Sequence, residues 1–361
     1  MNKVVHFRGL NGIRAFAAVA VLFSHTMGDL KHFGLHSIDT SLNLASYGVT
    51  MFFTLSGFLI TFLLLKEKDK SEESSINVKN FYIRRILRIW PLYFLYLIIC
   101  INLYYIFSIP YDSNYLIFYV FILANVPLIL QQSLPFIGHL WSIAVEEQFY
   151  LFWPWIAKIN KDKILKSSII LLLFLLLLKY LFFAVHIFYG YKIPLIAITV
   201  TRFYCMIIGC IAAILFYKKS KIINYLTSVY FAVFCWSIIF LSIVDKFQIS
   251  SALIDHEIIS IVTVGVILTQ INRKNFIIDL DTKPFNFIGK ISYGMYVYHP
   301  VIIFFFIKFL GAFKMDIWYN YIIVFFLITL TTILLSYVSY VFFENKFILM
   351  KDKYSSIKSS S

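Results

Sequence analysis

The chain has 361 residues, of which 61% are hydrophobic and 14% charged, and its mean hydropathy is +0.83. This composition excludes an ordinary soluble globular domain, because a surface in contact with water needs more polar side chains. The net charge of +14 does not indicate nucleic-acid binding, because the basic residues lie in short loops between apolar runs and form no single patch. The sequence therefore predicts a polytopic membrane protein with no nucleic-acid partner.

Apolar runs of about 20 residues, the length that crosses a bilayer as a helix, recur from one end of the chain to the other. They predict an all-α protein with about ten transmembrane helices in one membrane domain, 1–345, followed by a short tail, 346–361. The expected spans are 10–28, 45–65, 90–109, 140–157, 166–187, 196–217, 227–244, 257–271, 289–309 and 320–345.

One further apolar stretch, 115–132, does not fit this count. A full crossing there would invert the orientation of every later loop, and Asn125 and Pro127 interrupt the stretch, so we predict a re-entrant or interfacial segment. With the N-terminus inside the cell, most of the 32 lysines and arginines lie on the inner side, as the positive-inside rule requires. We therefore expect both termini in the cytoplasm.

The first expected span carries two costly residues, Arg14 and His25. A charge inside a bilayer costs a few kcal/mol, which favours a functional role. Their separation is close to three helical turns, so both side chains project from one face, about 16 Å apart along the axis. They are candidates to line one path across the membrane, although a snorkelling arginine and an interfacial histidine would explain either residue alone.

Three arginines, Arg84, Arg85 and Arg88, precede the third expected span. Arg85 and Arg88 share a helical face, and guanidinium groups suit bidentate recognition of phosphate. We expect these residues to hold a phosphorylated ligand at the inner surface of the membrane. Ordinary positive-inside anchoring is the alternative interpretation.

Two adjacent carboxylates, Glu146 and Glu147, lie within the fourth expected span. Carboxylates in such a segment need partners, and Arg14, Arg202 or His25 are candidates to supply a counter-charge or a hydrogen bond.

The remaining polar residues in the spans have simpler interpretations. His299, which precedes Pro300, is interpreted most simply as a helix-packing or hydrogen-bonding residue, with a catalytic role as the alternative, and Glu344 marks the inner boundary of the last span. The cysteines all fall in apolar stretches without metal-ligand spacing, so we expect structural burial and no metal site; they are Cys100, Cys205, Cys210 and Cys235.

Five sequence blocks follow one another along nearly the whole chain. Arg14 and His25 form an arginine-x10-histidine pair, Ser56 begins a serine-glycine-phenylalanine segment within FFTLSGFLIT, and Arg85 and Arg88 form an arginine-x-x-arginine segment. The blocks WSIAVEEQFY and ISYGMYVYHP complete the pattern. In these blocks the chain resembles the acyltransferase-3 family of integral membrane acyltransferases, which O-acetylate bacterial surface polysaccharides and some small molecules.

The resemblance implies a membrane-embedded O-acyltransferase, most simply an O-acetyltransferase, in the bacterial cytoplasmic (inner) membrane. Acyl-CoA, with acetyl-CoA as the expected form, would bind from the cytoplasm as the donor. Its binding set would be Arg84, Arg85, Arg88 and Ser56. The acceptor would be a saccharide hydroxyl at the outer face, in the O-antigen of lipopolysaccharide, in capsule, in exopolysaccharide or in peptidoglycan.

The resemblance also implies a catalytic set. His25 would act on the acceptor hydroxyl as a general base or would carry the acyl group transiently. Arg14 would help to position the donor, and Glu146 and Glu147 complete the set. Asp29, one turn beyond His25, competes with the two glutamates for the role of orienting the imidazole.

Many members of the family carry an additional C-terminal hydrolase-like domain, and we expect none in this chain. Acyl transfer would then be direct or would depend on a partner protein. A flippase or exporter of a lipid-linked saccharide is the alternative function, because it would also need intramembrane charges and an aromatic-lined path. A non-catalytic scaffold or sensor is less consistent, because the costly charges would lack a purpose.

Overall fold

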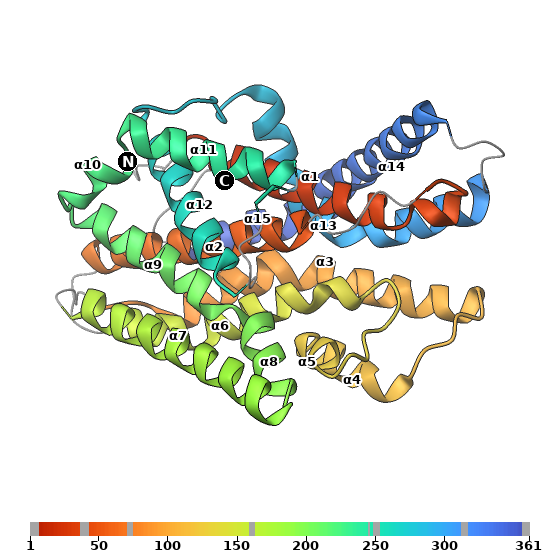
Figure 1. Ribbon diagram of the computed structural model, residues 1–361, viewed down its shortest axis with the longest axis horizontal. Helices are drawn as coiled ribbons and strands as arrows, with labels where there is room; N and C mark the ends of the chain where they lie inside the picture. Colours follow the sequence, from red (N-terminus) through yellow and green to blue (C-terminus); the bar gives the residue numbers. More distant parts are fainter. Residues whose placement is uncertain are drawn as a thin grey trace. The chain divides into compact units, whose positions relative to one another are not determined.

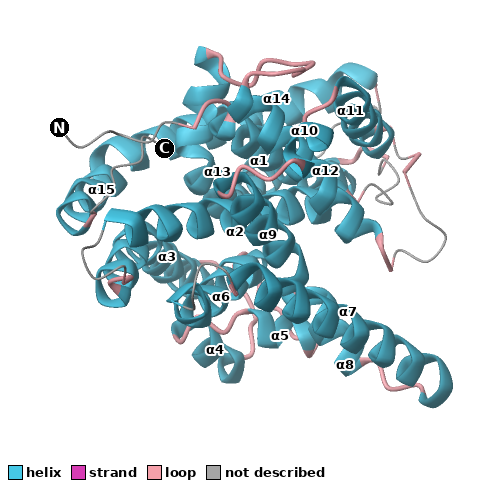
Figure 2. Cartoon of the chain, turned by 90° about the vertical axis from the view of Figure 1, so that its left-hand side faces the viewer, coloured by secondary structure: helices cyan, strands magenta, loops and turns pink. Residues whose placement is uncertain are grey.

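The computed structural model of the protein describes residues 7–36, 43–70, 75–158, 163–244, 246–247, 253–311 and 317–355. Throughout these residues the regular elements are helices, and the cartoon shows no strand in that part of the chain (Figure 2). This confirms the all-α prediction. A helix pairs its backbone groups internally, which is what an apolar chain requires in lipid.

Seven helical stretches within the described residues are long and apolar enough to cross a membrane, judged by length and composition. The protein is therefore a polytopic membrane protein. The stretches are α1 (Leu10–Gly28), α2 (Leu44–Lys70), α3 (Val78–Ile106), α7 (Ile164–Tyr189), the pair α8 (Ile193–Thr201) and α9 (Phe203–Tyr217), α13 (Lys283–Leu310), and Trp318–Tyr354, which begins with α14 (Trp318–Ser339).

The other three expected spans are also helical: α6 (Trp141–Lys158), α11 (Val229–Ile243) and α12 (Asp255–Asn272). Shorter elements connect or extend the long helices. These are η1 (Leu30–Phe33), η2 (Ser113–Tyr115), η3 (Gly138–Leu140), α10 (Ile222–Leu226), the π-helical turn η4 (Tyr340–Glu344), α15 (Asn345–Lys351) and η5 (Asp352–Tyr354).

The stretch 115–132 contains two five-residue helices, α4 (Leu116–Val120) and α5 (Asn125–Ile129). Neither is long enough to cross a bilayer, in agreement with the prediction that no spanning helix forms there. Asn125 is 4% exposed, and its side chain exchanges two hydrogen bonds of 3.2 and 2.7 Å with Gln148 of α6. The residue that interrupts the apolar run therefore ties it to a long helix.

Several helix boundaries differ from the predicted ones, and two of these differences have a local cause. The third helix begins at Val78, well before residue 90, because Asn77 caps it by accepting a 2.9 Å hydrogen bond from the backbone N–H of Asn80. The predicted span 196–217 is interrupted at Arg202, whose φ of 45° lies in the left-handed region and ends α8 before α9 begins. Hydropathy places the start of this helix too late because its first turns are polar, and it carries no signal for a left-handed residue.

The described chain divides into two compact units. We call residues 53–225 and 350–355 the arginine unit, and residues 7–52 and 226–349 the histidine unit, after the candidate site residues that each contains. Each unit is described by itself below.

Within the histidine unit, α1 and α13 lie side by side (Figure 1). They approach closely because glycines line the contact: a Cβ added at Gly12 would meet the backbone of Leu280, and one added at Gly289 would meet the backbone of Asn11. Also in this unit, α14 packs against α13, and α11 packs against α12.

Within the arginine unit, α2 and α9 approach closely through two glycines. A Cβ at Gly57 would meet the backbone of Met206, and one at Gly209 would meet the backbone of Thr54. Trp153 of α6 is fully buried and donates a 2.8 Å hydrogen bond from its indole N–H to the hydroxyl of Thr61. These contacts fix α6 and α9 around the same length of α2.

Candidate active site

Two imidazoles from distant parts of the sequence are in contact within the histidine unit. His25 Nδ1 of α1 lies 2.7 Å from His299 Nε2 of α13, and the ring centroids are 4.9 Å apart with an interplanar angle of 29°. His299 is 1% exposed, whereas His25 is half-buried. His299 is thus a hydrogen-bonding residue. Its partner is His25, the histidine expected from the sequence to act on the acceptor hydroxyl or to carry the acyl group.

Arg14 begins a chain of polar contacts on the same two helices. Its Nη1 donates a 2.9 Å hydrogen bond to Asn11 Oδ1, and the Asn11 amide is 3.4 Å from Asn286 Oδ1 of α13. Asn286 in turn donates a 3.0 Å hydrogen bond to Asp281. Both members of the predicted Arg14–His25 pair therefore lie on α1, and both are linked to α13.

Asp29 lies at the end of α1, where its backbone N–H donates a 3.2 Å hydrogen bond to the carbonyl of His25. Burial raises the pKa of the Asp29 carboxyl. Among the described residues, the hydrogen-bond partner of the imidazole itself is His299. The sequence had offered Asp29, Glu146 or Glu147 for this orienting role, and no local pattern indicated His299.

In the arginine unit, Arg84 is already engaged by the protein. It donates a 2.8 Å hydrogen bond to Glu67 Oε2, in an ion pair whose side chains are 13% and 9% exposed, and another of 2.8 Å to the carbonyl of Tyr354. An enclosed pair of this kind is costly to break, because removing one partner leaves a buried charge. Arg84 thus connects α3 to α2 and to the segment after α15.

Arg85 and Arg88 differ from Arg84. Among the described residues, neither of them has a hydrogen-bond or ion-pair partner, and Arg85 Nε is buried. The Arg85 guanidinium lies 5.6 Å from the ring centre of Phe81 and 5.5 Å from that of Tyr150. Aromatic faces hold a guanidinium without using its N–H groups, so these donors stay available for an anion.

The two predicted carboxylates have partners within the arginine unit. Glu146 accepts a 2.8 Å hydrogen bond from the Ser56 hydroxyl and a 3.3 Å hydrogen bond from that of Tyr150. Glu147 Oε2 accepts a 2.7 Å hydrogen bond from the Trp90 indole, and its Oε1 is buried without a partner in the described part of the chain. The structure thus brings Ser56 and Glu146 together, although the sequence assigned them different roles.

Two contacts of Arg202, a further candidate partner for these carboxylates, lie within the arginine unit. It donates a 2.7 Å hydrogen bond from Nε to the carbonyl of Thr199, and its guanidinium lies 5.5 Å from the ring centre of Trp141. The first of these bonds stabilises the left-handed turn between α8 and α9.

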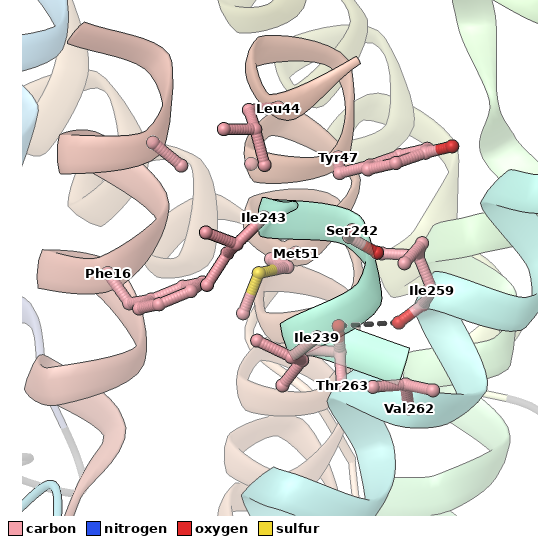
Figure 3. A pocket seen from close by; sticks show the side chains of 12 residues that line it. Phe16, Leu44, Tyr47, Met51, Ile239, Ser242, Ile243, Ile259, Val262 and Thr263 are labelled. Atoms are coloured by element: carbon pink, nitrogen blue, oxygen red, sulfur yellow. Dashed lines mark hydrogen bonds between the residues drawn. The ribbon is translucent and has the colours of Figure 1, made fainter. Parts of the chain in front are cut away.

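An apolar pocket with an empty volume of about 350 Å³ lies within the histidine unit, among α1, α2, α11 and α12 (Figure 3). Its α1 residues, Phe16 and Ala20, project from the side of that helix opposite to Arg14 and His25, at about 100° per residue. The pocket is therefore separate from the His25–His299 contact. Its lining is Phe16, Ala20, Leu44, Tyr47, Gly48, Met51, Ile239, Ser242, Ile243, Ile259, Val262 and Thr263.

Comparison with known proteins assigns the class. A family described as an acyltransferase domain matches residues 7–341, which include the candidate residues of both units. The chain belongs to the acyltransferase-3 family, and its long apolar helices are those of a membrane protein. No solved structure matches it.

Two relatives have related names. O-acetyltransferase OatA of Staphylococcus aureus (strain NCTC 8325 / PS 47) is 29% identical over 320 residues, which cover 82% of this chain and 50% of that protein. A putative O-acetyltransferase of Staphylococcus aureus (strain COL) is 29% identical over 386 aligned positions, which cover 96% of this chain and 58% of that protein. The chain thus spans about half the length of the curated relatives it matches.

Proposed function

We propose that the protein is a membrane O-acetyltransferase that moves an acetyl group from acetyl-CoA to a hydroxyl of a cell-surface saccharide. The contact between His25 and His299 carries this proposal, because it presents a held imidazole in a chain of the acyltransferase-3 family. The names of the two relatives support the choice of an O-linked acetyl group.

Arg85 and Arg88 are assigned to the phosphates of the donor. Neither guanidinium group forms a hydrogen bond or an ion pair within the described residues, although the charge of Arg85 acts on the nearby carboxyls of Glu146 and Glu147. Phosphate suits both guanidinium groups in geometry and charge. Arg84 is assigned a structural role instead, because two of its five N–H groups already donate to Glu67 and to the carbonyl of Tyr354. The bound donor would supply the activated acetyl carbonyl, as a thioester.

His25 is assigned to proton transfer. Its Nε2 would accept the proton of the acceptor hydroxyl as the hydroxyl oxygen attacks the acetyl carbonyl carbon and the carbon–sulfur bond breaks. The imidazolium would then return the proton to the departing sulfur, so that the protein ends in its starting state. Transient acylation of His25 is the alternative route, and an acetyl mass increase on His25 in rapidly quenched protein would identify it.

The same proposal includes the location of the protein and its orientation in the membrane. The protein would lie in a bacterial cytoplasmic membrane with both termini inside the cell, so that the donor comes from the cytoplasm and the saccharide from the outer side. The distribution of lysine and arginine along the sequence supports this orientation.

Incubation of the purified full-length protein with radiolabelled acetyl-CoA tests the activity, in parallel with mass spectrometry of surface glycans from cells with and without the gene. We expect acetyl-CoA consumption by the wild-type protein and loss of acetyl groups from one glycan in cells that lack the gene. A folded protein that neither consumes acetyl-CoA nor changes any glycan acetylation would refute the proposal. Movement of a lipid-linked saccharide without acetyl transfer would point to an exporter.

A further inference from the structure

His299 offers a way to decide which nitrogen of His25 can accept a proton. A neutral imidazole carries its hydrogen on one ring nitrogen and a lone pair on the other, and the partner of each nitrogen determines which form is present. Because the two rings share a hydrogen bond, the partner of one ring fixes the form of the other.

The assignment starts at Met295, one turn before His299 in α13. His299 Nδ1 lies 3.2 Å from the carbonyl oxygen of Met295. A carbonyl oxygen can only accept a hydrogen bond, so Nδ1 of His299 carries the hydrogen. The lone pair of the neutral ring is then on Nε2, which can only accept.

The tautomer of His299 in turn determines the tautomer of His25. Its Nδ1 lies 2.7 Å from His299 Nε2, so Nδ1 of His25 must carry the hydrogen in this bond. The lone pair of His25 is therefore on Nε2. This atom has no hydrogen-bond partner among the residues that the structure describes, and it is not fully enclosed.

The surroundings of His299 keep its ring in place. Tyr296, three residues earlier on α13, packs against it with ring centres 5.9 Å apart, and Phe52 packs on Tyr296 at 6.2 Å. His299 is also almost completely buried. A side chain packed in this way loses little further freedom when it forms the hydrogen bond to His25.

We infer that His299 is a positioning residue, which holds His25 with its hydrogen on Nδ1 and leaves the Nε2 lone pair available for proton transfer. This inference rests on the proposed function for its effect on catalysis, but the tautomer itself is independent of any activity. Without His299, the His25 ring would exchange between both tautomers and several orientations, and only part of the population would present Nε2 as a base.

Two matched substitutions separate positioning from packing. In His299→Gln, the amide group reaches the place of Nε2 and its oxygen can accept from His25 Nδ1. In His299→Asn, the shorter amide reaches only the place of Nδ1, so it can keep the bond to the Met295 carbonyl but not the bond to His25. Both variants replace the buried ring by an amide, so a packing defect should affect them alike.

The first measurement is acetyl transfer per folded molecule. We expect His299→Asn to lower kcat by about 10-fold to 100-fold, which is part of the total contribution of a general base, and to leave the KM for acetyl-CoA within about twofold. His299→Gln should recover most of kcat. Equal losses in both variants, in proportion to lower thermal stability, would show that His299 only fills space and would overturn the inference.

The second measurement reads the tautomer directly, by nitrogen NMR of protein labelled with ¹⁵N-histidine and assigned with His25→Ala. We expect a protonated Nδ1 and an unprotonated Nε2 for His25 in the wild type and in His299→Gln, and averaged signals in His299→Asn. A hydrogen on Nε2 of His25 in the wild type would overturn the inference. If the tautomer follows the expectation but acetyl-CoA is never consumed, the positioning role stands and the proposed function fails.

Discussion

Gly289 of α13 rests against the backbone of Asn11 in α1, and no space is left there for a Cβ atom. The Asn11 and Asn286 amides meet near this point, and farther along the same two helices His25 meets His299. Because the residue numbers increase together, the two helices run in the same direction. The glycine contact thus holds together, at one end, the same two helices that bring the imidazoles into contact farther along.

Replacement of Gly289 by alanine is therefore expected to destabilise the protein. Alanine normally stabilises a helix interior by about 0.5–1 kcal/mol relative to glycine, but here its methyl group would push α13 away from α1. We expect a lower Tm in detergent and a lower rate of acetyl transfer.

Gly294→Ala in the same helix is the control. Its Cβ would meet the Cβ of Ser336 at 3.1 Å, Glu344 Oε1 at 3.3 Å and the Cα of Ser336 at 3.4 Å, and each of these contacts is wider than that between a Cβ at Gly289 and the carbonyl of Asn11. We expect a smaller loss of stability than in Gly289→Ala. A Gly289→Ala protein as stable as the wild type would contradict the close approach of the two helices.

The three arginines of α3 should have different effects on acetyl-CoA binding when they are replaced. Joint replacement of Arg85 and Arg88 with glutamine should weaken binding of acetyl-CoA about tenfold or more, because each charge-assisted hydrogen bond contributes about 1.5–3 kcal/mol. Membrane insertion should be unchanged, because neighbouring lysines preserve the positive-inside pattern. Calorimetric titration of the purified variant measures the affinity.

Arg84→Gln provides the matched comparison on the same helix. It removes one partner of the enclosed ion pair with Glu67, so it should lower thermal stability while the remaining folded protein binds acetyl-CoA normally. Unchanged affinity in the Arg85/Arg88 double variant, or a specific affinity loss in Arg84→Gln, would reverse these assignments.

The two polar residues of α1 should also have separable effects. His25→Ala should lower acetyl transfer by about 10²–10⁴-fold and leave donor binding intact, because it removes the base but no contact to phosphate. Arg14→Ala should impair donor binding as well. Transfer rate and acetyl-CoA affinity, each measured per folded molecule, test both statements, and substantial turnover by well-folded His25→Ala protein would exclude a catalytic role for His25.

The segment between α12 and α13 should stabilise the protein less at acidic pH. Arg273 forms two hydrogen bonds of 2.7 Å with the carboxylate of Asp279, which hold the pKa of Asp279 down at about 2. A carboxyl whose pKa is lower in the folded state stabilises the protein above its ordinary pKa, and this contribution disappears as the pH falls from about 4 towards 2.

Asp279→Asn isolates this contribution. The variant should be slightly less stable than the wild type at neutral pH, since the pair is partly exposed, and the two Tm values should converge as the pH falls to about 2. Thermal unfolding in detergent across that pH range provides the measurement. A Tm difference that stays constant down to pH 2 would assign the effect to something other than this ion pair.

Orientation in the membrane can be tested on exposed lysines of the described chain. A cysteine at Lys163, just before α7, should react in intact cells only with a permeant thiol reagent, whereas one at Lys246, after α11, should also react with an impermeant reagent. The preceding loop position Lys161 lies outside the described residues. Labelling of position 163 from outside would reverse the proposed orientation of this region and would require 115–132 to be a crossing.

Hydropathy was sufficient to predict the long helices, because each apolar run must satisfy its backbone inside lipid. It could not predict the early start of α3 or the break at Arg202, because a side-chain cap and one left-handed residue leave the local composition unchanged. Likewise, the regular spacing of Arg14 and His25 was visible along one helix.

The partners of the candidate residues were not visible in the same way. His25 and His299 are separated by 274 positions, and Ser56 and Glu146 by 90, so only tertiary packing brings each pair together. From the sequence, Arg84 was predicted to bind phosphate like Arg85 and Arg88, because its partner Glu67 lies on another helix and could not be recognised. Spacing within one element thus selected the candidate residues, and packing determined what each of them contacts.

The parallel pairing of α1 and α13 also fixes a length. From residue 11 to residue 25 α1 advances about 21 Å, and from residue 286 to residue 299 α13 advances about 20 Å, compared with a hydrocarbon thickness of about 30 Å. The two packed helices hold the imidazole at one level along their axes. Under the proposed function, a donor held at one membrane surface would need its acetyl group on an arm long enough to reach the level of the imidazole, so donors would be selected by reach as well as by shape.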